Sequence, residues 1–137
     1  MAAKVASAHR DGRIPLILGI TGHRDLRPED VPMLEARIAG IIKELQADFP
    51  NTPLLLLSPL AEGADRLVAR VAVTMGVGLV VPLPMPQSEY ECDFQGHDST
   101  EENEASLLEF RTLLGQADLC FELPFAAGAT LASVRTI

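Results

Sequence analysis

Two short segments hold most of the residues whose types suit the binding of a phosphorylated ligand. Residues 19–24 read Gly-Ile-Thr-Gly-His-Arg, and residues 58–65 read Ser-Pro-Leu-Ala-Glu-Gly-Ala-Asp. Glycine lets a backbone approach a ligand closely, hydroxyl and N–H groups donate hydrogen bonds, and arginine pairs with phosphate. The predicted ligand-binding or phosphate-binding residues are Gly19, Thr21, Gly22, His23, Arg24, Ser58, Glu62, Gly63, Ala64 and Asp65.

These residues have distinct expected roles. Thr21 and Ser58 would offer hydroxyl groups, and the backbone at Gly22 and Gly63 would offer N–H groups. Arg24 would supply the positive charge for a phosphate. The same glycines also suit tight turns that bind nothing, but taken together the two turns favour a ligand site.

The charged side chains and histidines near these segments differ in how well they suit ligand binding. Asp65 is suited to accept hydrogen bonds from ribose hydroxyls, and Arg66 is a second candidate cation. Glu62 and Asp65 also complement the start of a helix. His23 has no second histidine or carboxylate at ligand spacing, so a solvated or capping role is favoured, and His97 offers even less.

Several familiar sites are missing from the sequence. There is no G-x-G-x-x-G fingerprint, no G-x-x-x-x-G-K-[ST] loop and no G-x-S-x-G elbow. Pro59 follows Ser58 and lacks the N–H that an oxyanion hole would use. The acidic residues Glu101, Glu102 and Glu104 indicate a solvated helix start rather than a metal site. No metal site and no certain cofactor are therefore predicted, apart from a nucleotide or nucleotide-derived ligand.

The elements that must position the two segments follow from the hydrophobic pattern. Apolar runs predict strands over residues 14–20, 54–57, 78–83 and 119–123. Helical periodicity predicts helices over residues 28–47 and 100–114, a further helix that ends at Gly76, and a short helical turn over residues 88–94. This alternation predicts an α/β, Rossmann-like three-layer sandwich with a mostly parallel sheet of four to six strands.

Finer details of the helices are also predicted. Ser99 begins an S-x-x-E capping box, and Gly115 is the expected C-cap of the same helix. Tyr90 and Phe94 are expected in the core rather than stacked on a base. The buried stripe of the first helix is expected to consist of Leu34, Ile38, Ile41, Ile42 and Leu45.

Length, composition and charge limit the class of protein to which the chain can belong. The chain has 137 residues, which fits a flexible N-terminal lead-in over residues 1–13 and one domain over residues 14–137. A net charge of −8 argues against a general binder of nucleic acid or of anionic membranes. The two separated cysteines, the polar N-terminal residues and the short apolar runs favour a cytoplasmic location without a membrane span.

In these two segments the chain resembles the SMF/DprA–LOG (SLOG) superfamily of Rossmann-like proteins. Residues 19–24 end the first predicted strand, and residues 57–65 are similar to the S-x-x-A-x-G-x-D turn of that superfamily. The third predicted strand follows at the expected distance, so the resemblance covers residues 14–123. It implies a nucleotide or nucleotide-derived ligand at the strand ends, as in a sensor or regulatory domain that forms a homodimer or is fused to an effector domain.

The resemblance leaves other functions open. LOG members are phosphoribohydrolases that cleave the base from a nucleoside monophosphate, and DprA members bind single-stranded DNA. The P-G-G-x-G-T-x-x-E segment with the catalytic glutamate of the LOG enzymes is absent from this chain. Either the chain lacks that activity, or it is truncated at its C-terminal end and a missing part would complete the site. No catalytic residue is carried over from the family, although Glu62 is a candidate base or stabiliser of a ribosyl cation.

Overall fold

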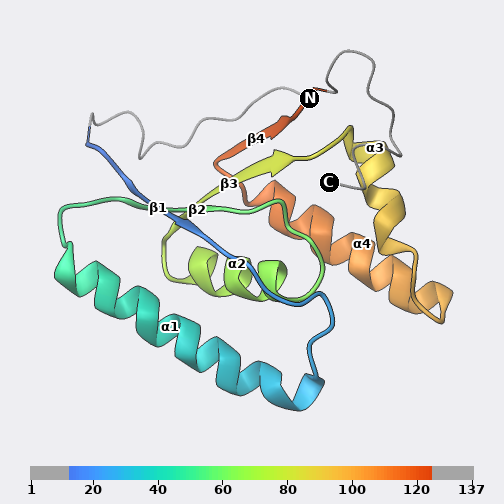
Figure 1. Cartoon of the computed structure of the whole chain (residues 1–137), viewed down its shortest axis with the longest axis horizontal. Helices are drawn as coiled ribbons and strands as arrows, with labels where there is room; N and C mark the ends of the chain where they lie inside the picture. Colours follow the sequence, from blue (N-terminus) through green and yellow to red (C-terminus); the bar gives the residue numbers. More distant parts are fainter. Residues whose placement is uncertain (1–12, 125–137) are drawn as a thin grey trace.

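A computed structural model describes residues 13–124 of the chain, and their strands form one parallel sheet (Figure 1). The strands are β1 (Leu16–Gly19), β2 (Leu54–Leu57), β3 (Gly78–Leu83) and β4 (Leu119–Glu122), in the order β1-β2-β3-β4. The predicted α/β class and Rossmann-like parallel sheet are thereby confirmed, with four strands. The lead-in expected before Arg13, and the end of the predicted domain at residues 125–137, lie outside the described residues.

The helices alternate with the strands as the hydrophobic pattern predicts. The first crossover contains the short 3₁₀ helix η2 (Pro28–Asp30) and α1 (Val31–Asp48), and the second contains α2 (Ala64–Thr74). The third crossover contains α3 (Gln87–Tyr90), η3 (Glu91–Phe94) and α4 (Thr100–Gly115). None of these helices combines the length and the apolar character that crossing a membrane requires.

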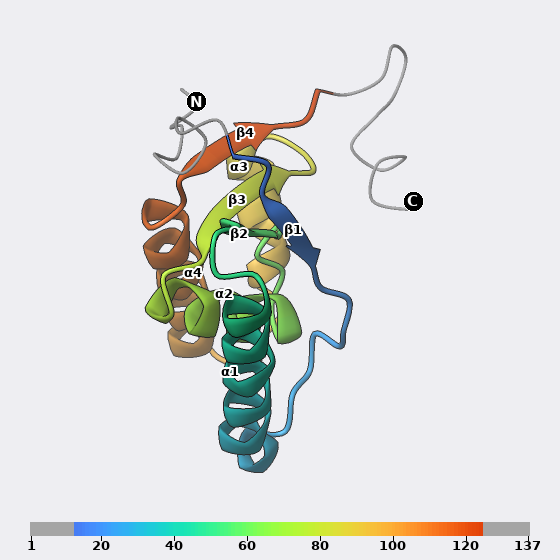
Figure 2. The same cartoon turned by 90° about the vertical axis from the view of Figure 1, so that its left-hand side faces the viewer.

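The helices α1, α2 and α4 lie on the same side of the sheet (Figure 2). Each strand pairs in parallel with the strand before it in the chain, and crossovers of one handedness then place successive helices on one face. Leu16 and Leu18 pack against the core, so Ile17 between them points to the opposite face, where it is 60% exposed. No helix of residues 13–124 covers that face (Figure 2). The described residues therefore form the sheet and one helical layer of the predicted sandwich.

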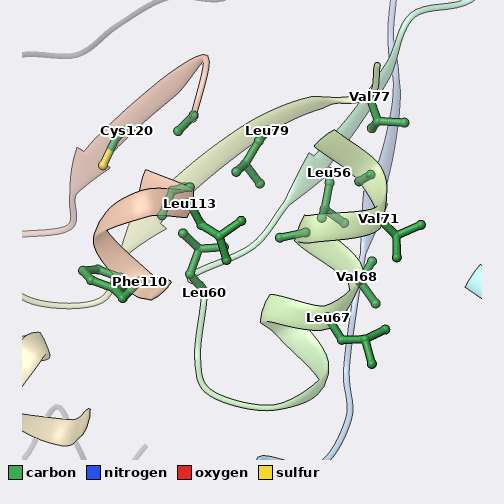
Figure 3. Close-up of a cluster of buried hydrophobic side chains, with 14 of the residues drawn as sticks. Leu56, Leu60, Leu67, Val68, Val71, Val77, Leu79, Phe110, Leu113 and Cys120 are labelled. Carbon is green, nitrogen blue, oxygen red and sulfur yellow. The ribbon is translucent and has the colours of Figure 1, made fainter. Parts of the chain in front are cut away.

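A single aliphatic core fills the space between the sheet and the helices. Leu56 of β2 and Leu79 of β3 point from the sheet toward Leu67 of α2 and Phe110 of α4 (Figure 3). All four side chains are at most 2% exposed. Burial on this scale, at roughly 25 cal/mol per Å² of apolar surface, is the main force that holds the layers together.

An aromatic cluster closes the end of the core beneath α3 and η3. The ring centroids of Tyr90 and Phe94 lie 5.1 Å apart, and Phe110 lies 4.9 Å from Phe94. The prediction that Tyr90 and Phe94 belong to the core is confirmed, since they are 6% and 0% exposed. The Tyr90 hydroxyl donates to the Pro59 carbonyl at 3.0 Å, and burial raises the pKa of Tyr90 to about 12.

Three details differ from the predictions. Strand β1 begins at Leu16 rather than at Ile14, because its partner β2 begins at Leu54 and Ile14 is left 87% exposed. Ile41 is 54% exposed, since it lies about 100° around the helix from its buried neighbour Ile42. Helix α4 continues through Gly115 and is capped by the next residue, whereas the predicted N-cap, Ser99, does accept a hydrogen bond from Glu102 N–H at 3.1 Å.

Candidate functional site

The two segments singled out in the sequence meet at one edge of the sheet. Strands β1 and β2 are parallel neighbours, with Gly19 opposite Leu57, so the turns that follow them leave the sheet side by side (Figure 1). The Ala64 N–H, at the start of α2, donates to the His23 carbonyl at 3.0 Å. Ala64 was predicted to bind a ligand, but its N–H joins the two turns instead.

The glycines of both turns are explained by this contact. Gly63 has a φ of +86°, and a Cβ there would lie 2.3 Å from the Arg24 carbonyl oxygen and 2.4 Å from the His23 carbonyl oxygen. A Cβ on Gly22 would lie 2.6 Å from the Cβ of Ala64. Since packing alone requires these glycines, their presence is not by itself evidence of a ligand.

The turn after β2 is braced from within. Ser58 is fully buried, and its Oγ accepts a hydrogen bond from Leu60 N–H at 3.1 Å. Asp65 Oδ2 accepts a hydrogen bond from Ala61 N–H at 3.2 Å, and burial raises the pKa of the Asp65 carboxyl above its ordinary value. The Ser58 hydroxyl thus faces the interior, where it holds the turn rather than a ligand.

The usual ligand position in open α/β sheets depends on a feature that the described strands lack. In open α/β sheets, ligands bind where the strand order reverses and the crossovers diverge to opposite faces. The order β1-β2-β3-β4 contains no reversal within residues 13–124. Any crevice here is therefore formed by the turns and by the loop between η3 and α4, not by a switch point of the sheet.

Three side chains hold the Glu62 carboxylate at this edge. Its Oε2 accepts hydrogen bonds from Ser106 Oγ, at 2.6 Å, and from His97 Nε2, while its Oε1 lies 3.7 Å from Arg24 Nη2. Burial raises the pKa of Glu62, but the hydrogen bonds from Ser106 and His97 outweigh it, so the pKa is lower than usual. The carboxylate is thus fixed in place and ionised at neutral pH.

His97 is a functional candidate that the sequence did not reveal. It lies in the loop between η3 and α4, and its Nδ1 is 3.9 Å from Glu102 Oε2 while its Nε2 contacts Glu62. Its backbone N–H donates to Asn103 Oδ1 at 3.1 Å, which fixes the loop against α4. The only sequence signal was its place just before the α4 cap, because its contact with Glu62 spans 35 residues.

Arg66 lies inside the protein and does not present its charge at the surface. It is 1% exposed, and its Nε donates to the Leu60 carbonyl at 3.0 Å. Its Nη1 donates to Ser106 Oγ at 2.9 Å, and its guanidinium carbon lies 4.4 Å from the ring centroid of Phe94. Burial lowers the pKa of Arg66, against the opposing charge of Glu109. Arg66 positions Ser106, which in turn positions Glu62.

A polar cavity of about 260 Å³ opens where the turns meet the η3–α4 loop. Two predicted residues, Arg24 and Glu62, line it together with His97. The carboxylates of Asp25 and Asp93 also line it, so acidic groups outnumber the cations. Such a set of groups accepts hydrogen bonds from hydroxyls and offers one exposed guanidinium, that of Arg24, to an anion.

The remaining predicted residues lie elsewhere. Gly22, His23 and Ala64 line a second cavity, of about 430 Å³, on the α1 side of the same turn. Thr21 and Gly19 are exposed and line neither cavity. Over residues 13–124, no three histidine, cysteine, aspartate or glutamate side chains are grouped so as to hold a metal ion.

Comparisons with known proteins add no assignment. A scan against protein-family models found no match, and searches of curated proteins and of solved structures found no match either. The resemblance to the SLOG superfamily therefore rests on the residues of the two turns, and the functional argument rests on the geometry of the site.

Proposed function

We propose that this protein binds a nucleotide or a nucleotide-derived ligand at the carboxyl ends of β1 and β2, as a sensor or regulatory domain. The observation that carries the proposal is the pairing of Arg24 and Glu62 on one polar cavity at the junction of the two turns. The Arg24 side chain is 57% exposed, and its ion pair with Glu62 is long, at 3.7 Å. Its guanidinium therefore has donors to offer an incoming phosphate.

The charge balance of the cavity determines which part of a nucleotide each wall would bind. Asp25, Glu62 and Asp93 would repel a phosphate but accept hydrogen bonds from ribose hydroxyls. Arg24 would bind the phosphate through the guanidinium donors that its long ion pair with Glu62 leaves exposed. This division favours a ribose phosphate over a bare inorganic anion.

A thermal-shift screen tests the proposal. Wild-type protein is titrated with nucleoside monophosphates, nucleoside diphosphates, NAD-type dinucleotides and cyclic nucleotides. A ligand present at about 100 times its dissociation constant stabilises the folded state by about 2.7 kcal/mol, which is readily seen for a domain of this size. Indifference to the whole panel would overturn the proposal.

A matched pair of variants locates the effect. Arg24→Ala should remove the stabilisation by phosphate-bearing ligands, because it removes the cation at the cavity. Arg37→Ala removes an equally charged, exposed side chain from α1, away from the cavity, and should leave the thermal shift unchanged. Equal losses in both variants would indicate a general charge effect rather than a site.

A second candidate function is hydrolysis of the N-glycosidic bond of a nucleoside monophosphate. It is favoured by the way in which Ser106 and His97 hold the ionised Glu62 at the cavity wall. A fixed carboxylate can stabilise an oxocarbenium-like ribosyl group and take a proton from the attacking water. Release of free base that is lost in Glu62→Gln, while binding persists, would establish this activity.

Binding of single-stranded DNA is the weakest of the three expectations. Affinity for nucleic acid depends on neutralising many phosphates, and the chain has a net charge of −8 with a carboxylate-rich cavity. A gel-shift assay at low salt, where such binding is strongest, should show no complex.

A further inference from the structure

The larger of the two cavities has mostly apolar walls, and Asp25 is the one acidic group of the polar cavity that also lines it. It has a volume of about 430 Å³ and opens between the turn after β1, helix α1 and the first turns of α2. Its apolar wall consists of Ile20, Leu26, Leu34, Ile38, Leu67 and Val68. The polar part of its lining includes Asp25 and the ion pair of Arg27 with Asp30, in which Nε and Oδ2 lie 2.8 Å apart.

The apolar cavity adjoins the polar cavity. Asp25 lines both of them, and the turn that carries Asp25 forms the wall between them. Each cavity is also lined by predicted site residues. The apolar cavity has Gly22, His23 and Ala64. The polar cavity has Arg24 and Glu62. The two cavities are therefore two compartments around one turn.

The volumes of the two cavities indicate that each would hold a different part of a nucleotide. Small-molecule sites in proteins usually have volumes of about 300–1,000 Å³ and mostly apolar walls. The polar cavity, at about 260 Å³, is below that range, so it would hold only the polar part of a nucleotide. The apolar cavity is within the range, and its walls match a planar uncharged ring.

We infer that the apolar cavity between α1, α2 and the turn after β1 binds the base of the ligand, while the polar cavity binds its ribose. The inference rests on the proposed function and deepens it, since it assigns the ligand class to nucleosides and nucleotides rather than to sugar phosphates. Asp25, at the boundary, is placed to accept a hydrogen bond from a ribose hydroxyl or from an amino group of the base.

Two probes separate the base from the rest of the ligand. Calorimetric titration compares adenosine 5′-monophosphate with ribose 5-phosphate, which has no base. The monophosphate should bind at least about 30-fold more tightly, because burial of the base adds apolar area that the sugar phosphate lacks. Equal affinities, or binding of ribose 5-phosphate alone, would overturn this inference and leave the proposed site in place.

Filling the cavity tests its location. Ile38→Phe extends a side chain of α1 into the cavity and should weaken binding of the monophosphate about 10-fold or more, with no change for ribose 5-phosphate. Ile41→Phe makes the same substitution at a 54% exposed position of the same helix and should change neither affinity. If Ile38→Phe unfolds, Leu26→Phe fills the same cavity from the turn.

The outcomes distinguish the two proposals. A cavity-filling variant that folds and binds the monophosphate with unchanged affinity would show that the base lies elsewhere, which overturns the inference alone. Failure of both probes to bind wild-type protein, together with a flat nucleotide screen, would overturn the proposed function and with it the inference. Selective loss of the monophosphate supports both.

Discussion

The turns that follow β1 and β2 meet at one edge of the sheet but differ in construction. The turn after β2 is stabilised by its own internal hydrogen bonds. Ser58 accepts one from Leu60 N–H, and Asp65 accepts one from Ala61 N–H. The turn after β1 is exposed along residues 21–25. The His23 carbonyl accepts a hydrogen bond from the other turn, and the Arg24 side chain forms an ion pair with it.

This difference gives the two turns different roles at the site. A braced turn presents Glu62 in one fixed geometry, which is what recognition or catalysis requires of a carboxylate. The exposed turn presents the Arg24 side chain, which is 57% exposed, to a ligand. The four predictions below test this contrast, from the largest expected effect to the smallest.

Gly63→Ala should destabilise the fold by about 4 kcal/mol or more, because the new Cβ meets two carbonyl oxygens and the φ of +86° is strained for alanine. The free energy of unfolding in urea measures the effect. Gly76→Ala is the matched control, since Gly76 has a φ of +80° but open space around it, and should cost only about 1–2 kcal/mol. Equal costs would mean that the contact between the turns does not constrain Gly63.

Arg66→Met should cost about 3 kcal/mol, because the Leu60 carbonyl and Ser106 lose a buried charged donor. Arg70→Met is the control: Arg70 pairs with the same Glu109 but is 39% exposed, so its loss should cost less than about 1 kcal/mol. Urea unfolding of both variants gives the comparison. A near-neutral Arg66→Met would show that the bracing of the second turn does not depend on this side chain.

The stability contributed by Glu62 should depend on pH. Its folded-state pKa lies below the ordinary 4.5, so the ionised carboxylate stabilises the fold above about pH 4.5 and this contribution is lost as the pH falls through the folded pKa. The stability difference between wild type and Glu62→Gln should therefore shrink on acidification. It is measured by urea unfolding at a series of pH values.

Asp65 provides a control of opposite sign. Its folded-state pKa is raised above the ordinary 3.8, so its contribution is complete below that value and is lost as the pH rises through the folded pKa. Wild type should gain stability relative to Asp65→Asn on acidification. A trend of the same sign for Glu62→Gln and Asp65→Asn would contradict the assignment of the two carboxyl groups.

Arg24→Ala should have the smallest effect on stability, below about 0.5 kcal/mol, because the side chain is exposed and its ion pair is long. Thermal unfolding without ligand measures it. A large loss would mean that Arg24 braces the junction of the turns, and the loss of ligand response in the same variant would then report folding rather than binding.

The sequence predicted the elements well because their signals are local. The apolar run at Leu54–Leu57, the periodicity of α2 and the Ser99 cap each lie within one element, and each is found in the structure. The structure makes β1 and β2 neighbours, and the two turns meet because parallel neighbours end at the same side of a sheet.

The site was predicted less completely because its contacts join distant parts of the chain. Ser106 and His97 reach Glu62 across 44 and 35 residues, and no spacing rule connects them. Ser58 and Arg66 have residue types typical of a ligand site, but both are buried, and Arg66 reaches Ser106 of α4. Burial of polar side chains is a tertiary property that hydrophobic patterning does not report.

The order of the strands also affects how the chain folds. Each strand pairs with the strand that precedes it in the chain, so no strand has to insert between two that are already paired. Each pairing closes only the loop of one crossover, which keeps the entropic cost of each step low. This strand order is compatible with assembly from the N-terminus, in which the β1–β2 pair that carries the candidate site forms before the later strands are added.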